Sequence, residues 1–229
     1  MEIKDLICSI NNFEANIVFD KNRSYREFAN GPSPFFFTPV EKGERKRYEK
    51  SENKYEFTST TAAIHIMDSS VEEIEKLFKL DDSGIYEYIC KMIRPYCKGV
   101  VDIKIGLVLF QFLHEVGHWY QFMSLDKNVA AYTTWNYEQE KNNYEKMRAL
   151  KDFVLQRQAR EKDNRLSAEE RMLFRQYTEE YRTIPKEKEA DEFALSYLKE
   201  TIDKYREVCR NKNSNSTIKR RNPAIGSNC

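Results

Sequence analysis

Residues 114–118 combine side chains that can hold a catalytic metal ion with one that can use it. They read His-Glu-Val-Gly-His, and the four-residue spacing places His114 and His118 side by side on one face of a helix. Two imidazoles so placed can bind a single zinc ion at about 2.0–2.1 Å. Glu115 can accept a proton from a water that the metal has acidified, and Gly117 leaves room for metal and substrate to approach. The pattern predicts hydrolysis by a metal-activated water.

A third ligand is expected further along the chain, because a catalytic zinc site has three protein ligands and an open fourth position. No histidine follows His118, but residues 187–191 read Glu-Lys-Glu-Ala-Asp. Glu187 would complete a His-His-Glu site, and Asp191, one helical turn on, would accept the N–H of a ligand histidine and fix its tautomer. Glu189 is the rival third ligand, although it would point to a different helix face from Asp191. The helix dipole alone also favours acidic residues at a helix start.

Peptide hydrolysis at such a site also needs a donor that stabilises the oxyanion. The candidates, which could equally contact substrate, are His65 and the tyrosines Tyr132 and Tyr181. His65 lies in an expected strand over residues 62–66, and an ordinary strand histidine is the simpler interpretation of it.

The motif at 114–118, followed by Glu187-Lys-Glu-Ala-Asp-Glu-Phe-Ala194, resembles the glutamate-zincin (gluzincin) metallopeptidases. The second segment is similar to the third-ligand helix of the ImmA/IrrE regulatory peptidases and, more distantly, of the HtpX and CAAX-prenyl-protease group. This resemblance implies one zinc ion, a glutamate third ligand and cleavage of proteins or peptides. It also implies that the strand containing His65 is the sheet edge that pairs with extended substrate. The resemblance covers two short helices, at about 103–125 and 185–199. The interval between them is longer than in ImmA/IrrE proteins, and the membrane helices of the HtpX group are absent.

The elements that must position these residues follow from periodicity and capping signals. Asp102 is a credible N-cap for a buried helix over about 103–125, and Pro185 opens a last helix that continues toward Val208. Between them, residues 137–182 predict two amphipathic helices joined around 163–164, the second of which Ser167 with Glu170 can cap. They would be an insertion in a single domain over 1–210. The polar tail at 211–229 is expected to be disordered.

The first hundred residues predict a small antiparallel or mixed sheet, and the whole chain an α+β fold. A strand or short helix is expected at 3–10 and strands at 15–19 and 55–67, with an irregular segment at 30–54. The three aromatic residues at 35–37 either fill the core or contact substrate, and burial statistics favour the core. Helices are expected at 70–80, opened by a capping box, and at 85–93, ending before Pro95.

Composition narrows the class of protein. The net charge of +1 gives no global field for nucleic acid or an anionic membrane, and a short basic cluster at 219–221 is typical of a solvated surface. No secretory signal or transmembrane segment is recognisable, so we expect a cytoplasmic protein. The five cysteines are scattered and fit reduced thiols.

These observations predict a zinc metallopeptidase that acts on a protein or peptide. Two alternatives stay open. One is a catalytically silent, zinc-stabilised regulatory or partner-binding module, and the other is a helical interaction protein without metal, in which both motifs are accidental.

Overall fold

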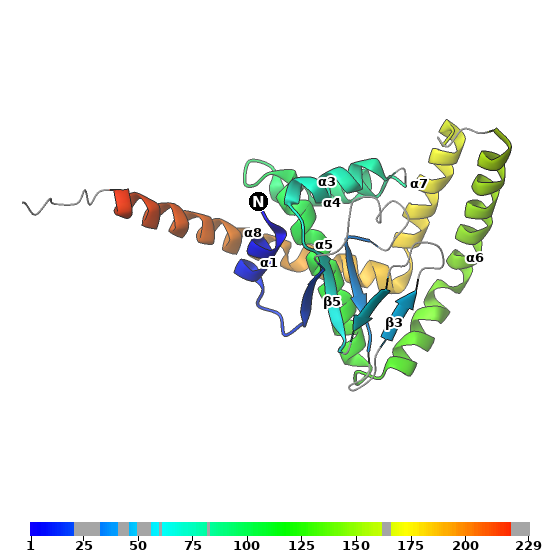
Figure 1. Cartoon of the computed structure of the whole chain (residues 1–229), viewed down its shortest axis with the longest axis horizontal. Helices are drawn as coiled ribbons and strands as arrows, with labels where there is room; N and C mark the ends of the chain where they lie inside the picture. The colour runs from blue at the N-terminus through cyan, green and yellow to red at the C-terminus, as the bar shows by residue number, and fades with distance from the viewer. Residues whose placement is uncertain are drawn as a thin grey trace, which may run out of the picture.

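A small mixed sheet lies beside a group of helices in an α+β arrangement, which agrees with the expected fold class (Figure 1). The computed structural model describes residues 1–20, 33–40, 46–49, 56–59, 61–81, 83–161 and 166–220. Its helices are α1 (Ile3–Ile10), α3 (Val71–Leu80), α4 (Ile85–Cys97), α5 (Ile103–Ser124), α6 (Val129–Glu161), α7 (Ala168–Arg182) and α8 (Pro185–Arg220). Its strands are β1 (Ile17–Asp20), β2 (Phe35–Thr38), β3 (Lys46–Glu49), β4 (Glu56–Ser59) and β5 (Ala63–Met67).

The main sheet has the strand order β1-β5-β2. β1 runs parallel to β5, and β2 runs antiparallel to it with Phe36 opposite His65. β3 and β4 form a separate antiparallel pair. Two sequence predictions are therefore wrong: in place of one strand over 55–67 the described residues form β4 and β5, which lie in different sheets, and the segment 30–54 contains β2 and β3. The strand with His65 is central in the main sheet, so the edge-strand prediction fails as well, and β2 occupies the edge among the described strands.

α5 is the central helix of the core. Its side chains from Ile105 to Trp119 are buried without interruption, which is expected of a helix that is apolar around its whole circumference. Asp102 caps it as predicted, accepting a hydrogen bond from the backbone N–H of Lys104 at 3.1 Å. α5 packs against α3, α4, α8 and β2, so the residues it carries have a fixed frame.

α3 and α4 follow the capping signals with one difference. Ser70 and Glu73 form the predicted capping box of α3. α4 does not end before Pro95 but continues to Cys97. A proline in the last turn removes only one backbone donor, and burial of Ile93 and Cys97 in the core holds the turn together.

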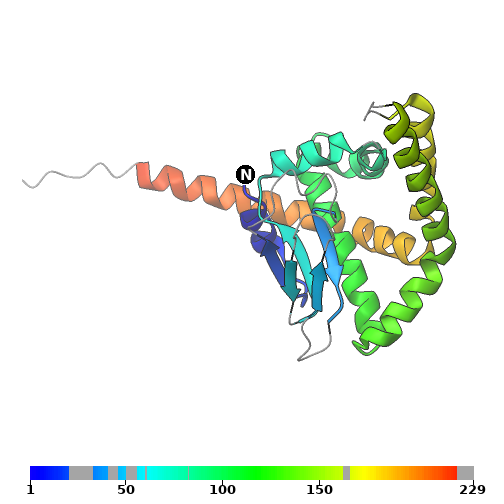
Figure 2. The same cartoon turned by 45° about the vertical axis from the view of Figure 1, so that its right-hand side comes forward.

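α6 and α7 stand side by side on one flank of the molecule, and the C-terminal part of α8 projects from the opposite flank (Figures 1 and 2). α6 begins at Val129 rather than near 137, and Ser167 with Glu170 forms the predicted capping box of α7. The predicted junction at 163–164 lies outside the described residues. α8 extends to Arg220, so the last helix is longer than the polar composition of 211–229 suggested, and residues 221–229 are not described.

Among the described residues, no helix combines the length and the apolar character that crossing a membrane requires.

Candidate metal site

Two imidazoles from α5 and one carboxylate from α8 converge in the interior of the protein. His114 Nε2 lies 3.1 Å from His118 Nε2, and Glu187 Oε2 lies 3.2 Å from the first and 3.7 Å from the second. Their exposed fractions are 3%, 8% and 4% for His114, His118 and Glu187. One ligand atom from each lies within 4.8 Å of the other two, so this buried group can hold a metal ion.

The contact between α5 and α8 brings these side chains together. At its closest point a Cβ on Gly117 would lie 2.9 Å from the Cα of Ala190 and 3.2 Å from its Cβ. Gly117 therefore makes room for the backbone of α8, which is a more specific role than the open approach to metal expected from the motif. Glu187 and Asp191 lie within one turn of this contact, so it sets their distance from the imidazoles.

Asp191 holds the first histidine. Its Oδ1 lies 2.9 Å from His114 Nδ1, and because a carboxylate only accepts, the imidazole donates from Nδ1. Nε2, which faces Glu187, is then the nitrogen that a metal ion can bind once its proton has left. This is the role predicted for Asp191. Arg182 Nη1 donates to the same oxygen at 3.0 Å, and its side chain is 8% exposed.

Gln121 holds the second histidine, and sequence reasoning missed it. Gln121 Oε1 accepts a hydrogen bond from His118 Nδ1 at 2.8 Å, while its Nε2 donates to the carbonyl of Lys186 at 2.8 Å. The sequence does contain a signal for this contact, because Gln121 follows His118 by three residues on the same helix face. The rival ligand Glu189 is exposed and receives a hydrogen bond from Gln121 at 3.3 Å, so it lies outside the histidine group.

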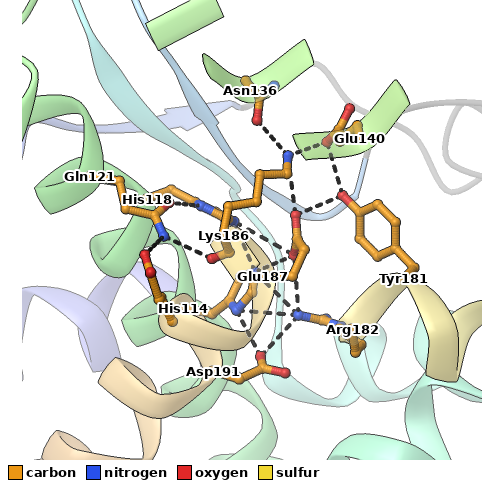
Figure 3. A network of polar contacts seen from close by, with 11 residues as sticks. His114, His118, Gln121, Asn136, Glu140, Tyr181, Arg182, Lys186, Glu187 and Asp191 are labelled. Carbon is orange, nitrogen blue, oxygen red and sulfur yellow. Dashed lines mark hydrogen bonds and ion pairs between the residues drawn. The ribbon is translucent and has the colours of Figure 1, made fainter. Parts of the chain in front are cut away.

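The second oxygen of Glu187 has partners of its own (Figure 3). Tyr181 donates its hydroxyl to Glu187 Oε1 at 2.7 Å, and Lys186 Nζ lies 3.3 Å from the same oxygen. Lys186 also donates to Asn136 Oδ1 at 2.5 Å and to Glu140 Oε1, both on α6. The sequence suggested Tyr181 as an oxyanion donor. In the structure its hydroxyl donates to Glu187, the potential third ligand.

The buried charges around the site shift the pKa values of His114 and Glu187. Burial and the Arg182 guanidinium lower the pKa of His114, but hydrogen bonds to Asp191 and Glu187 outweigh them and raise it to about 9. Burial raises the pKa of Glu187, yet the neighbouring His118 and His114 hold it well below its usual range. Burial, together with the charge of Glu187, keeps the pKa of Tyr181 well above 10, so its hydroxyl stays a donor.

A cavity of about 450 Å³ opens onto these three potential ligands. Glu115, 7% exposed, also lines it. Aromatic residues of β2 and α6 line it as well, and so does Gln111, one helical turn before Glu115. The lining residues include Phe35, Phe36, Phe37, Pro39, Gln111, Tyr132 and Thr133.

The other two weak candidates occupy different places. Tyr132 lines the cavity and packs edge-on against Phe37, with ring centroids 5.6 Å apart. His65 is not among the described residues that line the cavity. Its imidazole stacks on Phe36 at 4.9 Å, and its Nδ1 lies 3.4 Å from Asp20 Oδ2. This placement agrees with the simpler interpretation, a histidine packed within the sheet.

Arg182 and Lys186 also escaped the sequence analysis, because charged residues are common in amphipathic helices and at helix starts. Their burial became visible only when α6, α7 and α8 were seen to meet at the site.

Searches against protein-family models, curated proteins and solved structures each return no match for this chain. Function therefore has to be inferred from the site itself.

Proposed function

We propose that this chain is a zinc metallopeptidase that holds one zinc ion with His114, His118 and Glu187 and hydrolyses a protein or peptide substrate. One observation carries the proposal: three potential ligands and the carboxylate of Glu115 face a single cavity. A buried group of two imidazoles and one carboxylate with no catalytic carboxylate beside it would support only a structural site.

The residues present fit zinc. Two imidazole nitrogens and one carboxylate oxygen are the donor set of known catalytic zinc sites, which leave a fourth position open. Both imidazoles have their Nδ1 atoms bonded elsewhere, to Asp191 and Gln121, so both Nε2 atoms are directed at the space that Glu187 also faces. When bound, zinc supplies a Lewis acid and lowers the pKa of a bound water to about 7.

The chain's own residues then perform the proton transfers and the positioning. Glu115 accepts the proton of the attacking water at its carboxylate and returns it to the amine that leaves when the peptide bond breaks. Asp191 keeps the Nδ1 proton on His114, and Gln121 does the same for His118. Since both helices are packed in the core, the ligand atoms need little rearrangement to engage the ion.

Substrate recognition is proposed at β2 and the cavity wall. β2 is the sheet edge nearest the site, and an extended peptide can add to such an edge through backbone hydrogen bonds. Phe35, Phe36 and Phe37 of this strand are among the residues that line the cavity. Gln111 is 3% exposed, and its Nε2 has no hydrogen-bond partner among the described residues. Because an unpaired buried donor is costly, this amide is well suited to bind a carbonyl of the peptide.

The test is Glu115→Gln in the zinc-loaded protein, assayed on an unstructured protein such as casein and on a mixture of peptides. We expect full zinc content and a loss of hydrolysis of about 10²-fold or more, the usual contribution of a general base. Equal hydrolysis by wild type and variant would contradict the role of Glu115. Zinc binding without any hydrolysis by the wild type would favour the silent regulatory module instead.

A further inference from the structure

The two oxygens of Glu187 lie in different surroundings. Oε2 faces the two imidazoles at 3.2 and 3.7 Å, with Arg182 Nη1 at 3.6 Å. Oε1 points the other way, toward the hydroxyl of Tyr181 at 2.7 Å and the ammonium of Lys186 at 3.3 Å. No described interaction joins the side chain of Tyr181 or of Lys186 to an imidazole, so these two side chains act on the site through Glu187.

Lys186 is a buried cation whose bonding capacity is filled. It is 4% exposed, and an ammonium has three N–H donors. Its three acceptors are Asn136, Glu140 and Glu187. Two of these acceptors lie on α6, so the position of the ammonium against Glu187 is set by a helix that contributes no ligand. Figure 3 shows this chain of contacts from α6 through Lys186 to the carboxylate.

A carboxylate that binds a metal through both oxygens must offer both to the ion. Here Oε1 already accepts from a hydroxyl and an ammonium. Giving up these bonds would leave one N–H of Lys186 without an acceptor and the Tyr181 hydroxyl with only its longer contact to Glu140 Oε1 at 3.4 Å, and an unsatisfied donor in a buried site is costly. The geometry thus favours Glu187 as a ligand through one oxygen, and the place of a second oxygen on a bound ion would stay open for water or substrate.

Building on the proposed metal site, we propose that Tyr181 and Lys186 are positioning residues that hold Glu187 as a single-oxygen ligand, and that α6 fixes Lys186 through Glu140. Tyr181 is consequently not free to act as an oxyanion donor while it serves the ligand. The α6–α7 pair would therefore help to position a metal ligand, in addition to lining the cavity.

The experiment uses Tyr181→Phe in the full chain, with Tyr177→Phe as a matched control. Tyr177 lies one turn earlier on α7 and is buried, and its ring is tilted against that of the half-buried Tyr181 with ring centroids 6.2 Å apart. Zinc affinity is measured by competition with a chromophoric chelator, and the visible spectrum is recorded after loading with Co²⁺. The spectrum reports coordination number, because a five-coordinate ion absorbs more weakly than a four-coordinate one.

For Tyr181→Phe we expect zinc affinity about 10- to 100-fold weaker, as for other residues that orient a ligand. We also expect a weaker Co²⁺ absorption, because Oε1, then held by Lys186 alone, can turn toward the ion. Tyr177→Phe should match wild type in both. Unchanged affinity and spectrum in Tyr181→Phe would overturn the inference while leaving the metal site intact. A wild type that binds neither ion would overturn the site and the inference together.

A second pair of variants tests the role of α6. Glu140→Gln keeps the size of the side chain but removes the charge that holds Lys186 toward α6, so the ammonium is less firmly placed against Glu187 Oε1. We expect zinc affinity between that of wild type and that of Tyr181→Phe. The control is Glu138→Gln, an exposed position on the same helix, which should behave as wild type. Equal affinities for Glu140→Gln and Glu138→Gln would show that Glu140 on α6 does not contribute to zinc binding.

Discussion

The contact between α5 and α8 predicts that one added methyl group separates the metal ligands. In Gly117→Ala the new Cβ would lie 2.9 Å from the Cα of Ala190, whereas carbon atoms in contact lie about 3.5–4.0 Å apart. Backbone cannot rotate away, so the helices must part by about 0.6–1 Å there. A metal site tolerates errors of only about 0.2 Å in ligand distance, and Glu187 lies one turn from the contact.

The expected size of the effect follows from two opposing terms. Overpacking a core contact costs about 1–3 kcal/mol, while alanine is favoured over glycine in a helix by about 1 kcal/mol. The free energy of unfolding of the metal-free protein should therefore fall by no more than about 2 kcal/mol. Without metal the two helices can part and relieve the strain, whereas bound zinc would hold them at the ligand distances. Up to the full strain of about 1–3 kcal/mol then appears as lost zinc affinity, about 5- to 150-fold.

Chelator competition measures the zinc affinity, and urea unfolding of the metal-free protein measures stability. Gly106→Ala is the control, because its Cβ would collide with the Sγ of Cys97, on the α4 side of the same helix. We expect it to lose stability and keep its zinc affinity. Wild-type affinity in Gly117→Ala, or an equal loss in both variants, would refute the reasoning that the α5–α8 spacing sets the site.

Two further predictions concern the histidines. Because the pKa of His114 is raised to about 9, zinc must displace a proton at neutral pH. Apparent affinity should then rise about tenfold per pH unit from pH 7 and level off near pH 9 in competition titrations, and a flat profile would contradict a protonated His114. The metal-free protein gains stability from this proton fully below pH 6.5 and loses it as pH rises through 9, so urea midpoints should fall over that range. Gln121→Leu should weaken zinc binding about 10- to 100-fold, whereas Gln121→Glu, which keeps an acceptor for His118, should lose less; identical values for the two would exclude the hydrogen bond as the cause.

The ligands could be predicted from sequence because helical spacing is a local property. His114 with His118, and Glu187 with Asp191, each share a helix face at a separation of four residues. The caps at Ser70, Asp102 and Ser167 are local as well, and the structure confirms all three.

The residues that support the ligands could not be predicted in this way. Lys186 and Arg182 looked like ordinary charges of helix ends, and their burial depends on where α6, α7 and α8 meet. The strand at 55–67 was misread because β-branched residues continue through a break in the sheet, and no local pattern marks the change of partner strands. Gly117 was assigned to the substrate side since the sequence does not reveal that α8 packs on it.

The central claim is tested most directly by the zinc content of protein purified without added metal or an affinity tag, measured by mass spectrometry. Wild type would be compared with His118→Ala, Glu187→Gln and Glu189→Gln, the last being the rival ligand on the same helix. We predict close to one zinc per chain in wild type and Glu189→Gln, and none in the other two. Absence of metal from the wild type even after zinc is supplied would contradict the proposed site, and loss in Glu189→Gln with retention in Glu187→Gln would contradict the ligand assignment.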